Sequence, residues 1–231
     1  MAMQLYELAG SDPNRRFSPY CWRVRMALAH KGLTAEAVPW RFTEKDKIAF
    51  SGQGLVPVLV DGGKSVFDSA AIADYLEATY PDRPSLFGGP AGRAEQSFIA
   101  NWTVAVVHAG IARLIVADLL EILDAKDRDY FRKSREARFG MTLEEFQRGR
   151  EERVVGFRES LAPLRLTLEK QAYLGGAAPN YADYTVFGAF MWARGVSPFK
   201  LLADGDPVAA WRGRLLDAFD GIAAKATGFP V

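Results

Sequence analysis

The feature that most constrains the fold of this chain is a change of sequence pattern near residue 87. Before that point, segments typical of strands are interleaved with helical segments, in the order strand, helix, strand, helix, strand, strand, helix. Beyond it, apolar residues recur at helical spacing and nothing reads as a pair of strands. Residues 87–92, Phe-Gly-Gly-Pro-Ala-Gly, have the composition of a linker. We therefore predict an α/β domain over residues 1–87 and an all-helical domain over residues 93–231.

The same patterns place the individual elements. In the first domain we expect strands at 3–8, 34–38, 56–60 and 65–67, and helices at 19–31, 44–50 and 70–80. In the second domain, helical spacing is clearest over 98–109, 143–168, 180–194 and 207–219. Pro163 should kink its helix because it lacks a backbone N–H. Asn180 and Asp183 have the spacing of a capping box, which we interpret as structural.

Composition removes several functional classes. The 29 Lys and Arg residues nearly balance the 28 Asp and Glu residues, so the chain lacks the basic excess of a nucleic-acid-binding domain. One cysteine rules out an intrachain disulfide and a multi-cysteine zinc site, and two histidines are too few for a histidine-rich metal cluster. The N-terminus lacks a secretory signal pattern, and the uncharged run 96–112 is too short and too polar for a membrane span. We expect a cytoplasmic protein with no metal and no nucleic-acid or membrane partner.

The first candidate for chemistry is the segment Phe17-Ser18-Pro19-Tyr20-Cys21, where the loop after the first strand meets the first helix. Pro19 suits the first helical position, and Ser18 suits the N-cap, where its oxygen accepts a backbone N–H. A helix N-terminus also favours thiolates and other anions. The segment has the outline of a Cys-Pro-Tyr-Cys redox pair whose first cysteine is replaced by serine, which argues against thiol–disulfide exchange. Ser18 is therefore either a plain helix cap or a hydroxyl presented to an anionic ligand.

Cys21 is the competing nucleophile. It falls one turn into the predicted helix, and lone cysteines are among the most buried residues, so we expect a core role. A thiol-transferase activity would instead require an exposed, acidic Cys21.

Two further motifs adjoin the last two strands of the first domain. Val56-Pro57 opens a strand with a proline, which cannot donate to the sheet and often occupies a tight turn, sometimes as a cis peptide. Asp68-Ser69 joins a strand directly to a helix. Ser69 reads as an N-cap, and the Asp68 carboxylate beside free N–H groups could also hold an ammonium group.

The order and spacing of these motifs resemble the glutathione transferase family over the whole chain. The resemblance implies a thioredoxin-like glutathione-binding domain, then an all-α domain that completes a hydrophobic substrate pocket, and a homodimer. Val56-Pro57 is similar to the family's cis-proline motif, and Asp68-Ser69 to its acidic-Ser pair. The segment from Asn180 is similar to the capping motif of the family's core helix.

Four segments, 17–33, 127–135, 149–153 and 174–184, resemble more closely the bacterial β-aryl etherase group. That group uses glutathione to cleave the β-O-4 aryl ether bond of lignin-derived compounds. The sequence departs from the group at Leu55, where a polar residue is common, and in ending soon after Gly228-Phe229-Pro230 instead of continuing as a long tail. These departures affect one glutathione contact and the walls of the substrate pocket.

Carried over to this chain, the resemblance implies glutathione as co-substrate and Ser18 as the catalytic residue, donating a hydrogen bond to the glutathione sulfur. Val56, beside Pro57, would pair its backbone with the cysteinyl part of glutathione. Asp68 and Ser69 would hold the γ-glutamyl end. The thiolate would then attack a hydrophobic aromatic electrophile, in a detoxification reaction or in lignin degradation.

The electrophile pocket is expected where the first domain faces the first long helix of the second. Trp102 and His108 lie within two turns there, with residues 9–14 as a lid, although an isolated tryptophan or histidine is more often structural. The alternative function is a non-catalytic protein of the same fold that carries a ligand or serves in assembly. The joint presence of Ser18, Val56, Asp68 and Ser69 favours the enzyme.

Overall fold

The computed structural model describes residues 2–230 and contains a four-stranded sheet. Its strands are β1 (Gln4–Leu8), β2 (Glu36–Trp40), β3 (Val58–Asp61) and β4 (Lys64–Phe67), in the spatial order β2-β1-β3-β4. β2 runs parallel to β1, whereas β3 is antiparallel to both β1 and β4. A parallel neighbour requires a crossover, which α1 (Pro19–His30) supplies. The predicted α/β plan of the first domain is confirmed.

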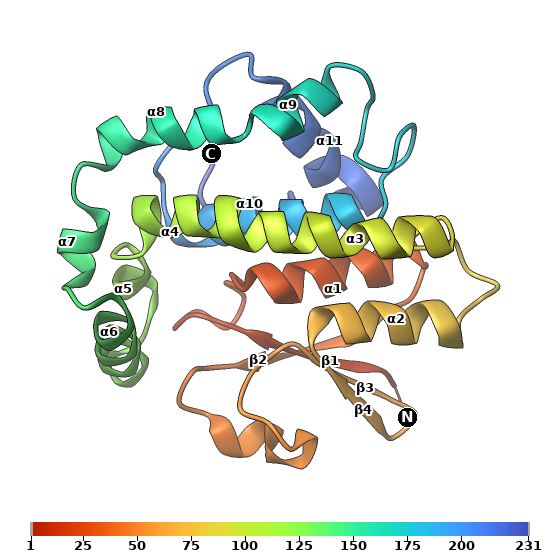
Figure 1. Cartoon of the computed structure of the whole chain (residues 1–231). Coiled ribbons are helices and arrows are strands. Elements are labelled where there is room, and N and C mark those ends of the chain that lie inside the picture. Colours follow the sequence, from red (N-terminus) through yellow and green to blue (C-terminus); the bar gives the residue numbers. More distant parts are fainter. Residues whose placement is uncertain (1, 231) are drawn as a thin grey trace.

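Helices cover the sheet in layers. Figure 1 shows α1 and α2 (Ser69–Thr79) on the face of the sheet that is turned toward the rest of the chain. The short 3-10 helix η1 (Lys45–Ser51) lies below the other face. Because α1 is packed between the sheet and the helices of the second domain, even Arg23 on this helix is buried together with Trp22 and Val24.

The second part of the chain is helical, as expected. It consists of α3 (Pro90–Trp102), the π-helix η2 (Thr103–His108), α4 (Ala109–Ile115), α5 (Leu119–Ile122), α6 (Ala125–Phe139), α7 (Leu143–Gln147), α8 (Arg150–Ser160), α9 (Ala162–Leu168), α10 (Tyr181–Val196) and α11 (Pro207–Gly221). The predicted interruption at Pro163 is present, because α8 ends at Ser160 and Pro163 lies in the first turn of α9. The limits 1–87 for the α/β domain and 93–231 for the helical domain remain a proposal.

The helical run Pro90–Ile115 is longer than its uncharged stretch, because it continues through Arg93 and Arg113 near its two ends. Its most apolar 18-residue window has a mean hydropathy of 1.5, so by length and composition alone the run could cross a membrane, and the uncharged run 96–112 understated its apolar length. Core helices satisfy the same test, and this helical run packs against α10.

Asp183, in the first turn of the central helix α10, connects this helix to the preceding loop and to α11. Its carboxylate accepts hydrogen bonds from the backbone N–H groups of Leu174 (2.8 Å), Gly175 (2.9 Å) and Asn180 (3.0 Å) and from the indole of Trp211 (2.8 Å). The predicted capping box is therefore present, and it extends to a loop and to α11. Burial raises the pKa of Asp183, while these donors oppose the shift by stabilising the carboxylate.

Two glycines of α10 permit its close approach to the start of α1. A Cβ on Gly188 would overlap the carbonyl oxygen of Pro19, and a Cβ on Gly195 would lie 2.8 Å from the Cβ of Phe17. Neither glycine is required by backbone conformation, because neither has a positive φ. They are required because the two backbones touch on either side of Ser18.

We predict that Gly188→Ala lowers the free energy of unfolding by ~1–3 kcal/mol, the usual cost of overpacking, because a backbone carbonyl cannot rotate away as a side chain can. The matched control is Gly156→Ala on α8, where a new Cβ meets nothing within 4 Å. That change should stabilise the protein by ~0.5–1 kcal/mol, since alanine has the better helix propensity. Denaturant unfolding of the two variants tests this, and equal effects would contradict the close approach.

Candidate active site

The sheet topology brings three sequence motifs to one edge. Tyr6 of β1 lies opposite Val58 of β3, and Val58 lies opposite Phe67 of β4. Because these pairs are antiparallel, the end of β1, the start of β3 and the end of β4 point to the same edge of the sheet. Ser18 follows β1, Val56-Pro57 precedes β3 and Asp68-Ser69 follows β4, so all three motifs converge there.

Ser18 is the N-cap of α1. Its Oγ accepts a hydrogen bond from the backbone N–H of Cys21 at 3.3 Å, and the side chain is buried. The first turn of α1 contains no acidic residue to neutralise the partial positive charge of the helix N-terminus. Since the oxygen is already an acceptor, the hydroxyl hydrogen is free to be donated. The capping role expected for Ser18 is confirmed, and it leaves the donor for a second partner.

The Val56-Pro57 peptide is cis. Pro57 is buried and Val56 is half-buried, just before β3 begins. The cis-proline that the resemblance implied for this motif is therefore present.

The cap of α2 differs from the sequence prediction. Asp68, not Ser69, is the N-cap, and its Oδ1 accepts the backbone N–H groups of Ala70 (2.8 Å) and Ala71 (3.1 Å). Asp68 has a φ of 69°, a strained conformation for a residue other than glycine. Ser69 is the first residue of the helix and is buried, and its carbonyl accepts the hydroxyl of Tyr181 at 2.6 Å.

Cys21 has the core role that was expected. It is fully buried, and burial raises the pKa of its thiol to about 12, assisted by the negative charge of Glu7. Such a thiol is un-ionised at neutral pH and out of reach of a dissolved substrate. This geometry argues against the thiol-transferase interpretation.

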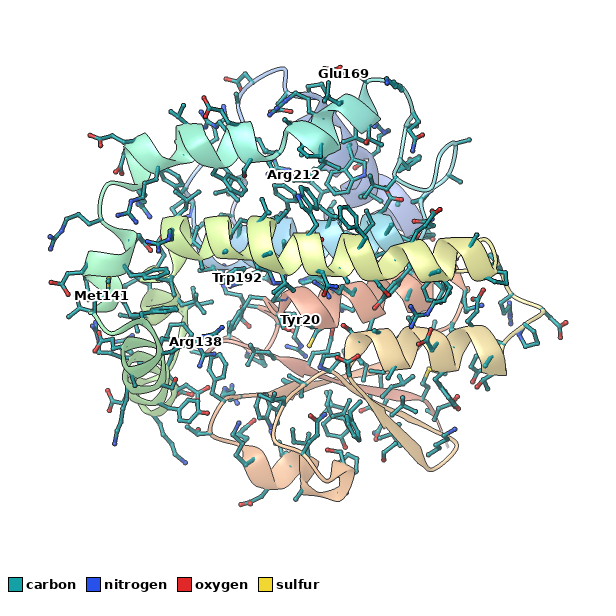
Figure 2. The ribbon with its side chains drawn as sticks, viewed as in Figure 1. Tyr20, Arg138, Met141, Glu169, Trp192 and Arg212 are labelled. Carbon is teal, nitrogen blue, oxygen red and sulfur yellow. The ribbon has the colours of Figure 1, made fainter. Side chains whose placement is uncertain are left out.

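His108 contacts residues of α1 and α10. Its ring lies 5.4 Å from Tyr20 and 6.1 Å from Trp192 between ring centroids, and its Nε2 is 3.4 Å from Nη2 of Arg23. Figure 2 marks Tyr20 on α1 and Trp192 on the neighbouring α10. Trp102 packs partly buried against the hydrophobic core and has no ring contact with His108 within residues 2–230. The substrate-pocket assignments of Trp102 and His108 therefore remain proposals, stronger for His108.

The electrostatics keep His108 neutral. Burial, together with the positive charge of Arg23, lowers the pKa of the imidazole to about 3. Arg23 itself is buried, and no carboxylate of the described chain forms a salt bridge with it. His108 therefore cannot serve as an imidazolium proton donor near neutral pH.

The loop over residues 9–14 was expected to act as a lid and is instead anchored. Ser11 donates its backbone N–H to Ile122 at 2.8 Å, and Arg41 donates to the carbonyls of Gly10 (3.3 Å) and Ser11 (3.1 Å). A Cβ on Gly10 would lie 2.6 Å from the Ile122 carbonyl oxygen. The close contact with α5 holds this loop in place.

Sequence reasoning missed the buried charges around Ser18. Glu7 on β1 is fully buried, with Arg25 at 3.4 Å and Arg16 at 3.6 Å, and Arg23 lies on the other side of α1. A signal was available, because Arg23 and Arg25 interrupt an otherwise apolar helix. Periodicity could not show that the helix face that carries Arg23 is covered as well.

Family models match both parts of the chain. Residues 13–84 match the glutathione S-transferase N-terminal domain, and residues 94–215 match the glutathione S-transferase C-terminal domain. Among curated relatives, glutathione transferase omega-1 of Caenorhabditis elegans is 30% identical over 126 residues, covering 54% of this chain and 50% of the relative. The maleylacetoacetate isomerase of Pseudomonas aeruginosa is 36% identical over 110 residues, covering 44% and 50%. The chain thus matches about half the length of each.

Solved structures extend the likeness over nearly the whole chain. The glutathione transferase GSTFuA3 of Phanerochaete chrysosporium superposes with a TM-score of 0.83 at 26% identity, covering 93% of this chain and 96% of that one. The glutathione S-transferase CsGST63524 of Ceriporiopsis subvermispora, solved with glutathione, has a TM-score of 0.82 at 24% identity, covering 95% and 97%, and supports the fold alone. Glutathione as co-substrate fits the two family models. With the predicted fold confirmed and a family model spanning half of its length, the chain belongs to the glutathione S-transferase family.

Proposed function

We propose that this protein is a glutathione transferase in which the Ser18 hydroxyl stabilises the thiolate of glutathione for attack on a hydrophobic electrophile. The observation that carries the proposal is the hydrogen bonding of that hydroxyl. Its oxygen accepts the Cys21 N–H at the N-terminus of α1, which leaves its hydrogen to donate to a sulfur bound at the sheet edge.

Ser18 and the N-terminus of α1 can supply the free energy needed to ionise the thiol of glutathione. A thiol with a pKa of ~8.5 is only a few per cent ionised at neutral pH. Lowering that pKa by about two units requires ~2.7 kcal/mol. A hydrogen bond to a charged group contributes ~1.5–3 kcal/mol, and a helix N-terminus adds ~0.3–1 kcal/mol. Ser18 and the start of α1 are together sufficient without a general base.

The remaining glutathione contacts follow the family pattern. The Val56 backbone, beside cis-Pro57, would pair with the cysteinyl part of glutathione where the chain enters β3. The second carboxylate oxygen of Asp68 would hold the γ-glutamyl ammonium group, because Oδ1 is already occupied by the cap of α2. Ser69 lies at the N-terminus of the same helix, where the γ-glutamyl carboxylate would be favoured.

We further propose β-aryl ethers of lignin-derived aromatics as the electrophile, on the resemblance of the four segments described above. In this reaction the thiolate attacks the carbon that bears the ether oxygen, the carbon–oxygen bond breaks, and the phenolate leaves with the electron pair. The proposal includes a cytoplasmic homodimer, as the family resemblance implies.

Replacing Ser18 tests the thiolate mechanism. We expect Ser18→Ala to raise the pKa of bound glutathione by about 1–2 units, the equivalent of one lost charge-assisted hydrogen bond, with turnover at neutral pH reduced about tenfold or more. The pKa is read from the ultraviolet absorbance of the bound thiolate during a pH titration. Ser18→Thr should restore both properties.

A matched pair separates the cap from the hydroxyl. Alanine at the N-cap costs about 1 kcal/mol of stability, whereas glycine costs only a few tenths. Ser18→Gly should therefore raise the thiol pKa as much as Ser18→Ala without the same loss of stability. Unchanged thiol pKa in both variants would exclude the proposed role and favour the non-catalytic alternative.

Phenol release from a fluorogenic β-aryl ether tests the substrate class. We expect release that requires both glutathione and Ser18. If glutathione is conjugated to a general aromatic halide but no phenol is released from the ether, the transferase proposal stands and the etherase assignment is excluded. Glutathione binding without turnover of either compound would indicate the ligand-binding or assembly alternative.

The burial of Cys21 predicts its reactivity. Under native conditions at mildly alkaline pH we expect no modification by a disulfide reagent, because the thiol is enclosed and its pKa is raised to about 12. In guanidinium chloride the single cysteine should react stoichiometrically. Rapid native modification, with loss of activity, would revive the thiol-transferase interpretation.

A further inference from the structure

The contact between α1 and η2 couples a permanently charged side chain to a histidine. Nη2 of Arg23 is 3.4 Å from Nε2 of His108, and the guanidinium of Arg23 stacks on the Tyr20 ring at 4.5 Å. A guanidinium has five N–H donors, no acceptor, and no accessible neutral form. Its partner nitrogen must therefore present a lone pair, since two N–H groups facing each other would repel.

We propose that Arg23 holds His108 as the neutral tautomer protonated on Nδ1, and that this N–H donates a hydrogen bond to an oxygen of the electrophile. The inference rests on the proposed transferase function and specifies its substrate class. That class is an aromatic electrophile with an acceptor oxygen beside the reacting carbon, such as an aryl ketone. Arg23 is the positioning residue, and His108 is the group that meets the substrate.

The surroundings of His108 favour a hydrogen-bond donor over an acid. Tyr20 on α1 and Trp192 on α10 pack against the imidazole, and Arg23 is the one charged group that shifts its pKa. Asp68 and Tyr181 act on Arg23 from the start of α2 and from α10, without forming a salt bridge to it. A positive neighbour and aromatic walls both oppose a charged imidazole, which agrees with the lowered pKa.

The other ring nitrogen is available. Nδ1 of His108 has no hydrogen-bond partner within residues 2–230, yet it is not among the fully enclosed polar atoms that lack one. An aromatic substrate seated beside Tyr20 and Trp192 could place an oxygen there. A neutral imidazole that polarises a carbonyl is an established way to stabilise developing negative charge without transferring a proton.

Arg23 makes few interactions besides those with His108 and Tyr20. Its Nε is buried without a partner, and no carboxylate of the described chain pairs with the side chain. An isolated buried cation is costly, so a role in the site accounts for it better than stability does. If Arg23 only joined α1 to η2, an apolar side chain of similar length would serve as well.

The first experiment is a nitrogen-15 correlation spectrum of the imidazoles in the wild-type protein. With two histidines in the chain, the four ring nitrogens are assigned with His30 and His108 single variants. We expect His108 protonated on Nδ1 and unchanged between about pH 5.5 and 8, the range in which ordinary histidines titrate. In Arg23→Met the tautomer should shift or His108 should titrate, and Arg23→Lys should restore the wild-type state. An Nε2–H tautomer, or a titrating His108 in the wild type, would overturn the proposal.

The second experiment compares two electrophiles, phenacyl chloride, which has a carbonyl beside the reacting carbon, and benzyl chloride, which does not. His108→Phe should lower kcat for phenacyl chloride about tenfold more than it lowers kcat for benzyl chloride, the equivalent of one hydrogen bond. His108→Asn carries an amide N–H near the Nδ1 position and should recover part of the loss, whereas His108→Gln should not. The KM for glutathione should be unchanged in all three variants.

The outcomes separate the two proposals. Equal losses with both electrophiles would show that His108 serves the fold or the thiol instead, and would overturn this inference while the transferase stands. No glutathione-dependent turnover of either electrophile in the wild type would overturn the transferase, and the substrate role of His108 with it. The tautomer measurement needs no substrate, so it decides whether Arg23 sets the tautomer of His108 whatever the electrophile experiment shows.

Discussion

The whole arrangement depends on the direct contact between the start of α1 and the glycine face of α10. Phe17 meets Gly195 and Pro19 meets Gly188, so that Ser18, between them, is fixed by a helix more than 150 residues distant in sequence. A larger residue at either position would move the one hydroxyl whose placement matters most. The second domain therefore fixes the position of the cap of α1, and under the proposed function this is how it would influence bound glutathione.

Desolvation is the second physical effect that shapes the site, because it changes the pKa values of the groups around α1. α1 is largely enclosed between the sheet and the second domain, and this enclosure raises the pKa of Cys21, lowers that of His108 and buries Arg23. Each effect has a different chemical result: an inert thiol, a neutral imidazole and a cation without a counter-charge. They are consistent with the proposal that the Ser18 hydroxyl, and not Cys21, acts on a thiol bound at this helix terminus.

Local sequence rules predicted much of the fold. The order of strands and helices, the interruption at Pro163 and the capping box at Asn180 all depend on near neighbours in sequence, and all are present. Errors arose where two local rules competed. Both Asp68 and Ser69 can cap a helix, and the choice of Asp68 required a positive φ that sequence does not reveal.

The sequence by itself determined the two-part plan, the cap at Ser18, the core position of Cys21 and the family, because each is written in short-range patterns or motif spacing. Tertiary structure decided the partners of His108, the anchoring of the loop at Ser11 and the burial of Glu7 and Arg23. These depend on which faces of distant elements meet. Periodicity identifies an apolar face of a helix, but only packing shows which other faces are also covered, and it is this burial that shifts pKa values.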